Sequence, residues 1–167
     1  MSLLFTPYHI GNLKTPNRLV RSATAERMAD QDGRPLPPLT RLYEELTQGG
    51  VGLIITGHMY VHPSGKCHPE MTGIYKDELI PELAKLTEAA HSQGGKIAVQ
   101  INHGGMQCDS ESVEGAMAPS ATTEAISERP VRQIEQDEIY TLIDAYAQAA
   151  RRALAILFGY AREGASQ

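Results

Sequence analysis

Side chains that could bind a transition metal gather in one stretch of the sequence. The members of this group are histidines and cysteines: His58, His62, Cys67 and His68, followed further along by His103 and Cys108. Zinc sites usually present paired ligands at tight spacing, such as two cysteines separated by two residues. His58 and His62 instead flank a strand end, where side-chain alternation and Pro63 direct them apart. We therefore expect solvated loop histidines and no metal site, and a metal-binding module is the weakest alternative.

Three further polar side chains lie at the ends of short apolar runs, where binding or acid–base chemistry is possible. Gln100 ends one such run, His103 follows it in the sequence NHGG, and Tyr60 follows an earlier run. Taken alone, a glutamine at this position is most often a solvated surface cap. His103 could be a general acid or a hydrogen-bonding loop residue. Tyr60 could contact a substrate or pack at the rim of a site.

The composition excludes several classes of protein. The chain has 167 residues, a net charge of −5 and two cysteines. This length suits one domain with a hydrophobic core, and the mild acidity argues against nucleic acid or an anionic membrane as a partner. Two cysteines are too few for a disulfide framework, which favours a reducing compartment such as the cytoplasm. We find no signal peptide, membrane-spanning run or glycine-rich phosphate loop.

A repeated order of elements predicts the fold. Twice, an apolar stripe at helical spacing ends at a pair of glycines and is followed by a short apolar run. The second helix follows Asp77, which we expect to cap it. Repeats of helix, glycine stop and buried strand are typical of β/α units with parallel strands. The expected helices lie near 39–48 and 77–93, and the expected strands at 51–56 and 96–101.

The rest of the chain completes one domain. Residues 1–16 predict a lead-in hairpin, and residues 17–153 predict β/α units that begin with a strand near 17–22. A long loop separates the last predicted strand from a helix over about 135–153, whose apolar stripe includes Ile143 and Tyr146. Residues 154–167 form an aberrant tail, in which the helix either runs on or gives way to a poor fourth strand.

Four ordered segments resemble the old yellow enzyme family, the FMN-dependent NADH:flavin oxidoreductase / NADH oxidase group. They cover the expected strands and one later loop: NRLVRSATAE at 17–26, GGVGLIITGHMYVHPSGK at 49–66, KIAVQINHGG at 96–105 and APSAT at 118–122. The resemblance extends from about Leu4 to Arg152 and implies the N-terminal portion of the family's domain. It implies an α/β fold, a partial TIM (β/α) barrel of about the first three to four β/α units.

The resemblance also implies a cofactor, a reaction and a set of binding residues. The family carries FMN at the carboxyl ends of its strands and moves hydride from NAD(P)H through FMN to an α,β-unsaturated carbonyl-like small molecule. Amide and backbone N–H donors suit the negative charge that reduced flavin gathers near N1 and O2. Many members of the family have a hydroxyl or thiol side chain at the position of Ala25, and alanine cannot donate a hydrogen bond there. The implied FMN-binding residues are Ser22, Ala23, Thr24, His58 and Gln100.

The end of the sequence departs from the family pattern. The expected His-x-x-His on a fourth strand is replaced by LFGYAREG, and no counterpart of the phosphate-binding strands follows. The tail reads like a shifted frame or a premature stop, so we expect weak or absent FMN binding and assign no catalytic residue. The alternative function is a non-catalytic half-barrel fragment that forms homo-oligomers through its exposed edges.

Overall fold

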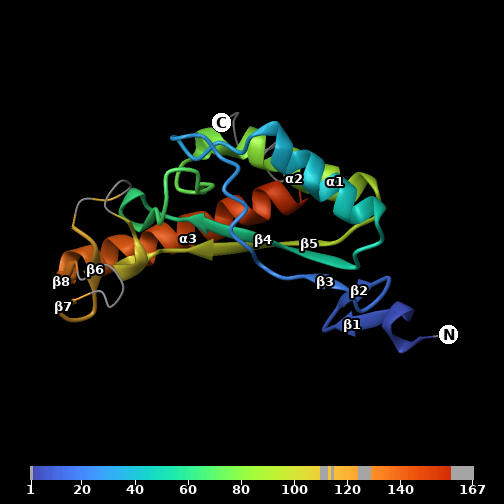
Figure 1. The fold of residues 1–167 in the computed structure, drawn as a ribbon, viewed down its shortest axis with the longest axis horizontal. Coiled ribbons are helices and arrows are strands. Elements are labelled where there is room, and N and C mark those ends of the chain that lie inside the picture. The colour runs from blue at the N-terminus through green and yellow to red at the C-terminus, as the bar shows by residue number, and fades with distance from the viewer. Residues whose placement is uncertain (1, 110–112, 114, 124–128, 159–167) are drawn as a thin grey trace, which may run out of the picture.

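The centre of the molecule is a parallel sheet with helices along one face (Figure 1). The computed structural model describes residues 2–109, 113, 115–123 and 129–158. In this sheet the strands follow the order β3-β4-β5, and both pairs are parallel. The predicted parallel arrangement is confirmed. The central elements are β3 (Val20–Arg21), α1 (Pro37–Gln48), β4 (Leu53–Tyr60), α2 (Ile80–Ser92) and β5 (Ile97–Asn102).

A separate hairpin precedes the sheet, as the sequence predicted. A short 3-10 helix, η1 (Leu3–Phe5), leads into β1 (Tyr8–Ile10), which pairs antiparallel with β2 (Leu13–Thr15). Gly11 occupies the turn with φ at +56°, a left-handed conformation that costs glycine little.

The first helix begins and ends at residues that suit those positions. Pro37 stands in the first turn of α1, where its missing N–H costs no hydrogen bond. Beyond the last turn, Gly50 adopts φ of +85° and redirects the chain into the sheet. Leu39 and Tyr43 are buried on the inner face of the helix.

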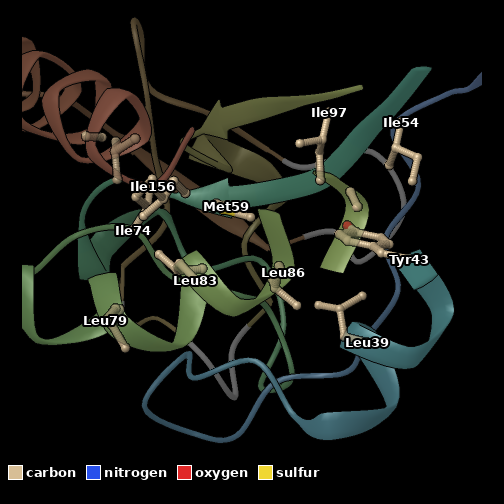
Figure 2. Close-up of a cluster of buried hydrophobic side chains, with 13 residues drawn as sticks. Leu39, Tyr43, Ile54, Met59, Ile74, Leu79, Leu83, Leu86, Ile97 and Ile156 are labelled. Carbon is tan, nitrogen blue, oxygen red and sulfur yellow. The ribbon is translucent and has the colours of Figure 1, made fainter. Parts of the chain in front are cut away.

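Strand β4 is longer than predicted and contains a bulge. It extends to Tyr60, so His58 lies within the strand and not after it. The pairing steps from Ile55 opposite Ala98 to His58 opposite Gln100, which places one extra residue in β4. The bulge reverses the side-chain alternation. As a result Ile54 and Met59, five positions apart, both pack against the helices in the hydrophobic core (Figure 2).

Helix α2 supplies much of that core. Leu83 and Leu86 of α2 are buried, and so is Leu79 of the turn before it, as the helical spacing predicted (Figure 2). Ala90, the last member of the predicted stripe, is buried too. Asp77, however, does not cap α2, whose N-cap residue is Leu79. Asp77 begins a 3-10 turn, η3 (Asp77–Leu79), and its carboxylate accepts hydrogen bonds from Arg151 and Arg152 of the last helix, α3 (Gln136–Phe158), instead.

The segment predicted as a long loop carries short elements of its own. The described residues form a second small sheet in the order β6-β8-β7, with β6 parallel and β7 antiparallel to β8. Two 3-10 turns follow the carboxyl ends of the long strands. The turns are η2 (Pro63–Gly65) after β4 and η4 (Gly105–Gln107) after β5. The strands of the small sheet are β6 (Met117–Ala118), β7 (Thr122–Thr123) and β8 (Pro130–Gln133).

The last helix, α3 (Gln136–Phe158), settles the open alternative for residues 154–158: the helix runs on. The helix therefore extends past residue 153 into the expected tail, and residues 159–167 lie outside the described part. The predicted stripe is only partly buried. Ala149 of the stripe joins the core, whereas Ile143 and Tyr146 are exposed. Ile156, beyond the predicted stripe, also joins the core. The amino-terminal half of α3 extends past the central sheet toward the small sheet, where α2 no longer covers it (Figure 1).

Among the residues that the structure describes, no helix is both long enough and apolar enough to cross a bilayer.

Candidate functional site

In the described part of the chain, helices pack on one face of the central sheet and not on the other. Ile54 pairs with Ile97, and both belong to the core beneath the helices. Because side chains alternate along a strand, the pairs next to them face the opposite side. We call this opposite side the open face. Its residues on β4 and β5 are Ile55, His58, Ala98 and Gln100.

Gln100 presents an exposed amide on the open face. Its side chain is exposed, and none of the described residues forms a hydrogen bond with the amide. Its backbone N–H donates to Thr56 Oγ1 at 3.0 Å. Thr56 is buried within the bulge, and its hydroxyl accepts the hydrogen bond of a backbone N–H that the irregular pairing would otherwise leave without an acceptor. The bulge thus fixes the backbone of Gln100 while its amide points to solvent.

His58 lies opposite Gln100 and is half buried. Its Nδ1 is 3.4 Å from Asn102 Nδ2, and its ring centroid is 5.6 Å from that of His68. Its Nε2 is buried and has no partner among the described residues. Burial, and secondly the charge of Arg27, lower the pKa of His58 below its ordinary value. His58 is therefore a neutral ring near pH 7.

The segment after β3 reaches the same region. Arg21 Nη1 donates to the carbonyl of Ser22 at 2.8 Å and also to the hydroxyl of Thr24. A Cβ atom built at Gly57 would lie 2.5 Å from the Thr24 carbonyl oxygen. Only glycine permits this approach, which sets the segment directly against β4 beside His58.

The structure thus brings the five implied FMN-binding residues together along adjacent strands. The segment Ser22–Thr24 adjoins β4 at Gly57, and His58 is paired with Gln100. Ser22 and Thr24 are exposed, and Ala23 is half buried. Their contact with a flavin remains a prediction.

Sequence reasoning missed a polar network beneath this segment. Glu26 has a side chain that is only 7% exposed, and it lies 3.6 Å from the Arg21 guanidinium. Tyr43 of α1 donates its hydroxyl hydrogen to Glu26 Oε1 at 3.2 Å. Burial raises the pKa of Glu26. The only sequence signal was an acid close after the RSAT motif, and the partner from α1 could not be inferred.

A chain of hydrogen bonds links the loops after β4 and β5. The Gly105 N–H donates to His103 Nδ1 at 3.0 Å, so the ring hydrogen of neutral His103 is on Nε2. That nitrogen is 3.0 Å from Ser64 Oγ, which is 2.8 Å from His62 Nδ1. Burial, followed by His62, lowers the pKa of His103. The hydrogen-bonding alternative for His103 accounts for all of these contacts.

Two other early candidates have simpler roles. Tyr60 is 2% exposed, its ring centroid is 5.0 Å from that of Tyr75, and its hydroxyl donates to the Asp32 carbonyl at 3.3 Å. These contacts match the rim-packing alternative. Within the described ranges, no three side chains of histidine, cysteine, aspartate or glutamate converge as metal ligands. The lack of a metal site stays a prediction.

Comparisons with known proteins agree on one family. The profile of the NADH:flavin oxidoreductase / NADH oxidase family matches residues 3–159. The N,N-dimethylglycine/sarcosine dehydrogenase of Chromohalobacter salexigens is 36% identical over 155 residues, which cover 89% of this chain and 22% of that protein. The NADPH dehydrogenase of Bacillus subtilis is 34% identical over 153 residues, which cover 90% of this chain and 44% of that protein.

The solved structures agree with the sequence relatives. An old yellow enzyme homologue from Zymomonas mobilis superposes with a TM-score of 0.83 at 28% identity, over 94% of this chain and 46% of that chain. The expected fold class, part of a (β/α) barrel, is therefore confirmed. The chain spans less than half the length of these relatives.

Proposed function

The chain belongs to the NADH:flavin oxidoreductase / NADH oxidase family, and from that premise we propose that its open face forms one side of an FMN site. The observation that carries the proposal is the exposed amide of Gln100, paired with His58 and flanked by the segment Ser22–Thr24. In parallel β/α proteins, ligands bind at the carboxyl ends of the strands. The three groups of residues lie toward those ends.

The donors on this face fit the flavin ring. Reduced flavin gathers negative charge near N1 and O2, which hydrogen-bond donors stabilise. Within the described part of the chain, neither the Gln100 amide nor the backbone N–H groups of Ala23 and Thr24 have an acceptor. His58, a neutral ring, adds a flat surface without a competing positive charge. The face therefore offers donors and apolar area together.

The activity we propose is that of old yellow enzymes. Bound FMN would supply hydride transfer from NAD(P)H to a small α,β-unsaturated carbonyl acceptor. This chain's residues would hold the ring and orient its pyrimidine side through Gln100. Since the chain spans less than half of its relatives, we expect the 167 residues alone to bind FMN weakly. The cytoplasm is the proposed location.

A second candidate function is self-association without catalysis. In the described sheet, β3 and β5 are both edge strands, which leaves hydrogen-bonding groups open to pairing. Helix α3 also exposes Ile143, Leu154 and Phe158. A homo-oligomer would bury these edges and apolar side chains.

One experiment separates the two functions. The chain is purified with added FMN and analysed by gel filtration with an absorbance scan over the flavin bands, followed by titration of flavin fluorescence. The flavin site predicts weak, saturable binding that Gln100→Ala weakens. Gln93→Ala, an exposed glutamine beyond the opposite end of β5, is the matched control and should bind as the unsubstituted chain does.

Two results would reject the flavin site. One is a colourless oligomer without saturable binding, which would support self-association. The other is an equal loss in Gln100→Ala and Gln93→Ala, which would show that the open face has no special part in binding.

A further inference from the structure

Two free cysteines lie side by side at the turn that follows β5. A Cβ atom built at Gly104 would lie 2.3 Å from Cys67 Sγ and 2.7 Å from Cys108 Sγ. Both sulfurs thus border the space that one methyl group would fill. Gly104 has φ of −68°, which any residue can adopt. The position therefore excludes a side chain because of the two sulfurs and not because of its backbone conformation.

The backbone already ties the two cysteines together on both sides. The Gly104 N–H donates to the Gly65 carbonyl at 2.9 Å, and the Asp109 N–H donates to the Cys67 carbonyl at 3.1 Å. Disulfides need Cα atoms about 4.4–6.8 Å apart and Cβ atoms directed toward each other. Two cysteines held by neighbouring backbone hydrogen bonds, with sulfurs around one methyl-sized space, approach that geometry with little backbone movement.

The two thiols differ in a way that suits an ordered reaction. Cys67 is half buried and Cys108 is fully buried. A hydrogen bond with Cys108 lowers the pKa of Cys67, whereas the same bond, together with burial, raises the pKa of Cys108. The thiolate is the reactive form of cysteine. Cys67 is thus the thiol that meets an oxidant first, and Cys108 is the resolving thiol.

We propose that Cys67 and Cys108 are a site of reversible oxidation, at which a hydroperoxide converts the two thiols to an intramolecular disulfide. The Cys67 sulfur attacks the peroxide, the O–O bond breaks, and a sulfenic acid and hydroxide form. Cys108 then attacks the Cys67 sulfur, the S–O bond breaks and water leaves as the S–S bond forms. Overall, two thiols and one hydrogen peroxide give one disulfide and two waters.

The disulfide would join the loops that follow β4 and β5. These loops also carry the hydrogen bonds from His103 through Ser64 to His62. Oxidation would therefore fix η2 against η4 at the carboxyl ends of two adjacent strands. Because the proposal requires no cofactor, it stands or falls independently of the flavin site.

The test uses the full chain, reduced, desalted and treated with hydrogen peroxide. Alkylation and intact mass measure free thiols, and peptide mapping identifies the linked pair. We expect both alkylation sites to be lost, the mass to fall by two hydrogens, and a Cys67–Cys108 peptide that dithiothreitol separates. Cys108→Ser should instead accumulate a sulfenic acid on Cys67 that dimedone traps.

A glycine pair provides the matched control. Gly104→Ala inserts a methyl group between the sulfurs and should lose the disulfide while both thiols remain alkylatable. Gly49→Ala changes a glycine of ordinary φ, −71°, far from either thiol in the chain and should form the disulfide normally. Circular dichroism checks that each variant is folded.

Three outcomes would overturn the proposal. In the first, both thiols stay alkylatable at peroxide concentrations that oxidise free cysteine. In the second, the disulfide forms only between chains on a non-reducing gel. In the third, the urea-unfolded chain closes the disulfide as fast as the folded chain, so that the structure does not promote it.

Discussion

The two faces of the central sheet are built from the same strands but have opposite characters. The helix-covered face carries Ile54, Met59 and Ile97, packed against α1 and α2. The open face carries Gln100, exposed, and the neutral ring of His58. One strand pair thus contributes stability on one side and the groups of the proposed flavin site on the other, and the bulge in β4 decides which residue faces which side.

The largest expected effect lies on the helix-covered face. Leu83→Ala empties a fully buried position of α2, so the free energy of unfolding should fall by about 2–5 kcal/mol. Leu154→Ala truncates the same side chain at a position that is 55% exposed, and it should change stability by less than about 0.5 kcal/mol. Urea unfolding measures both, and equal losses would contradict the packing described for the two helices.

The stability of the protein should be sensitive to acid because of two neighbouring histidines, His58 and His68. Burial, then Arg27, lowers the pKa of both His58 and His68, and Glu70 partly opposes this at His68. At a pH below 6.5, the ordinary pKa of histidine, the unfolded chain binds protons more readily than the folded chain. The free energy of unfolding should therefore fall as the pH decreases. The slope is at most about 1.4 kcal/mol per pH unit and group.

His68→Gln removes one of these groups and should flatten the fall. Urea unfolding at pH 7.5 and at lower pH, on the order of 5.5, measures the difference. His9→Gln, an exposed histidine of the hairpin, is the control and should leave the slope unchanged. A slope that is the same in all three proteins would argue against buried neutral histidines.

A smaller effect is expected where α3 meets η3. Hydrogen bonds from Arg152 and Arg151 lower the pKa of Asp77, so its contribution is present at neutral pH and is lost as pH falls below about 4. Since Asp77 is 56% exposed, Asp77→Asn should cost about 1 kcal/mol or less. Asp144→Asn, on the exposed side of α3, should cost less, and the reverse order would contradict the arginine contacts.

The smallest effect on stability belongs to the open face itself. Gln100→Ala removes an amide that has no partner among the described residues. The free energy of unfolding, measured with urea, should therefore change by less than about 0.5 kcal/mol. A larger loss would indicate that the amide has a structural role. Stability and flavin binding would then no longer separate between the two faces.

The local patterns of the sequence predicted the helix-covered face well. Glycine pairs and helical stripes predicted α1, α2 and the parallel strands that follow them. The bulge escaped prediction because it depends on how β4 and β5 pair. Asp77 was expected to cap a helix, but arginines from a distant segment bind it instead. The apolar stripe predicted for α3 is only partly buried, because periodicity in the sequence does not show where the neighbouring helix α2 stops covering it.

The candidate site depended on a different kind of information. Without the family resemblance, nothing in the sequence would distinguish Ser22, His58 and Gln100 from ordinary surface residues. The fold brings them together through the pairing of β4 with β5 and the close approach at Gly57. The Glu26–Tyr43 bond could not be predicted because it joins a loop to a helix seventeen positions away.

The most direct test of the account is a titration of the isotopically labelled chain with FMN, followed by amide NMR spectra. Weak binding is sufficient for this measurement. We predict the largest shifts at the backbone amides of Ala23 and Thr24 and at the side-chain amide of Gln100. Shifts confined to the β6-β8-β7 sheet or to exposed α3 residues, or no shifts in excess FMN, would contradict a flavin site on the open face.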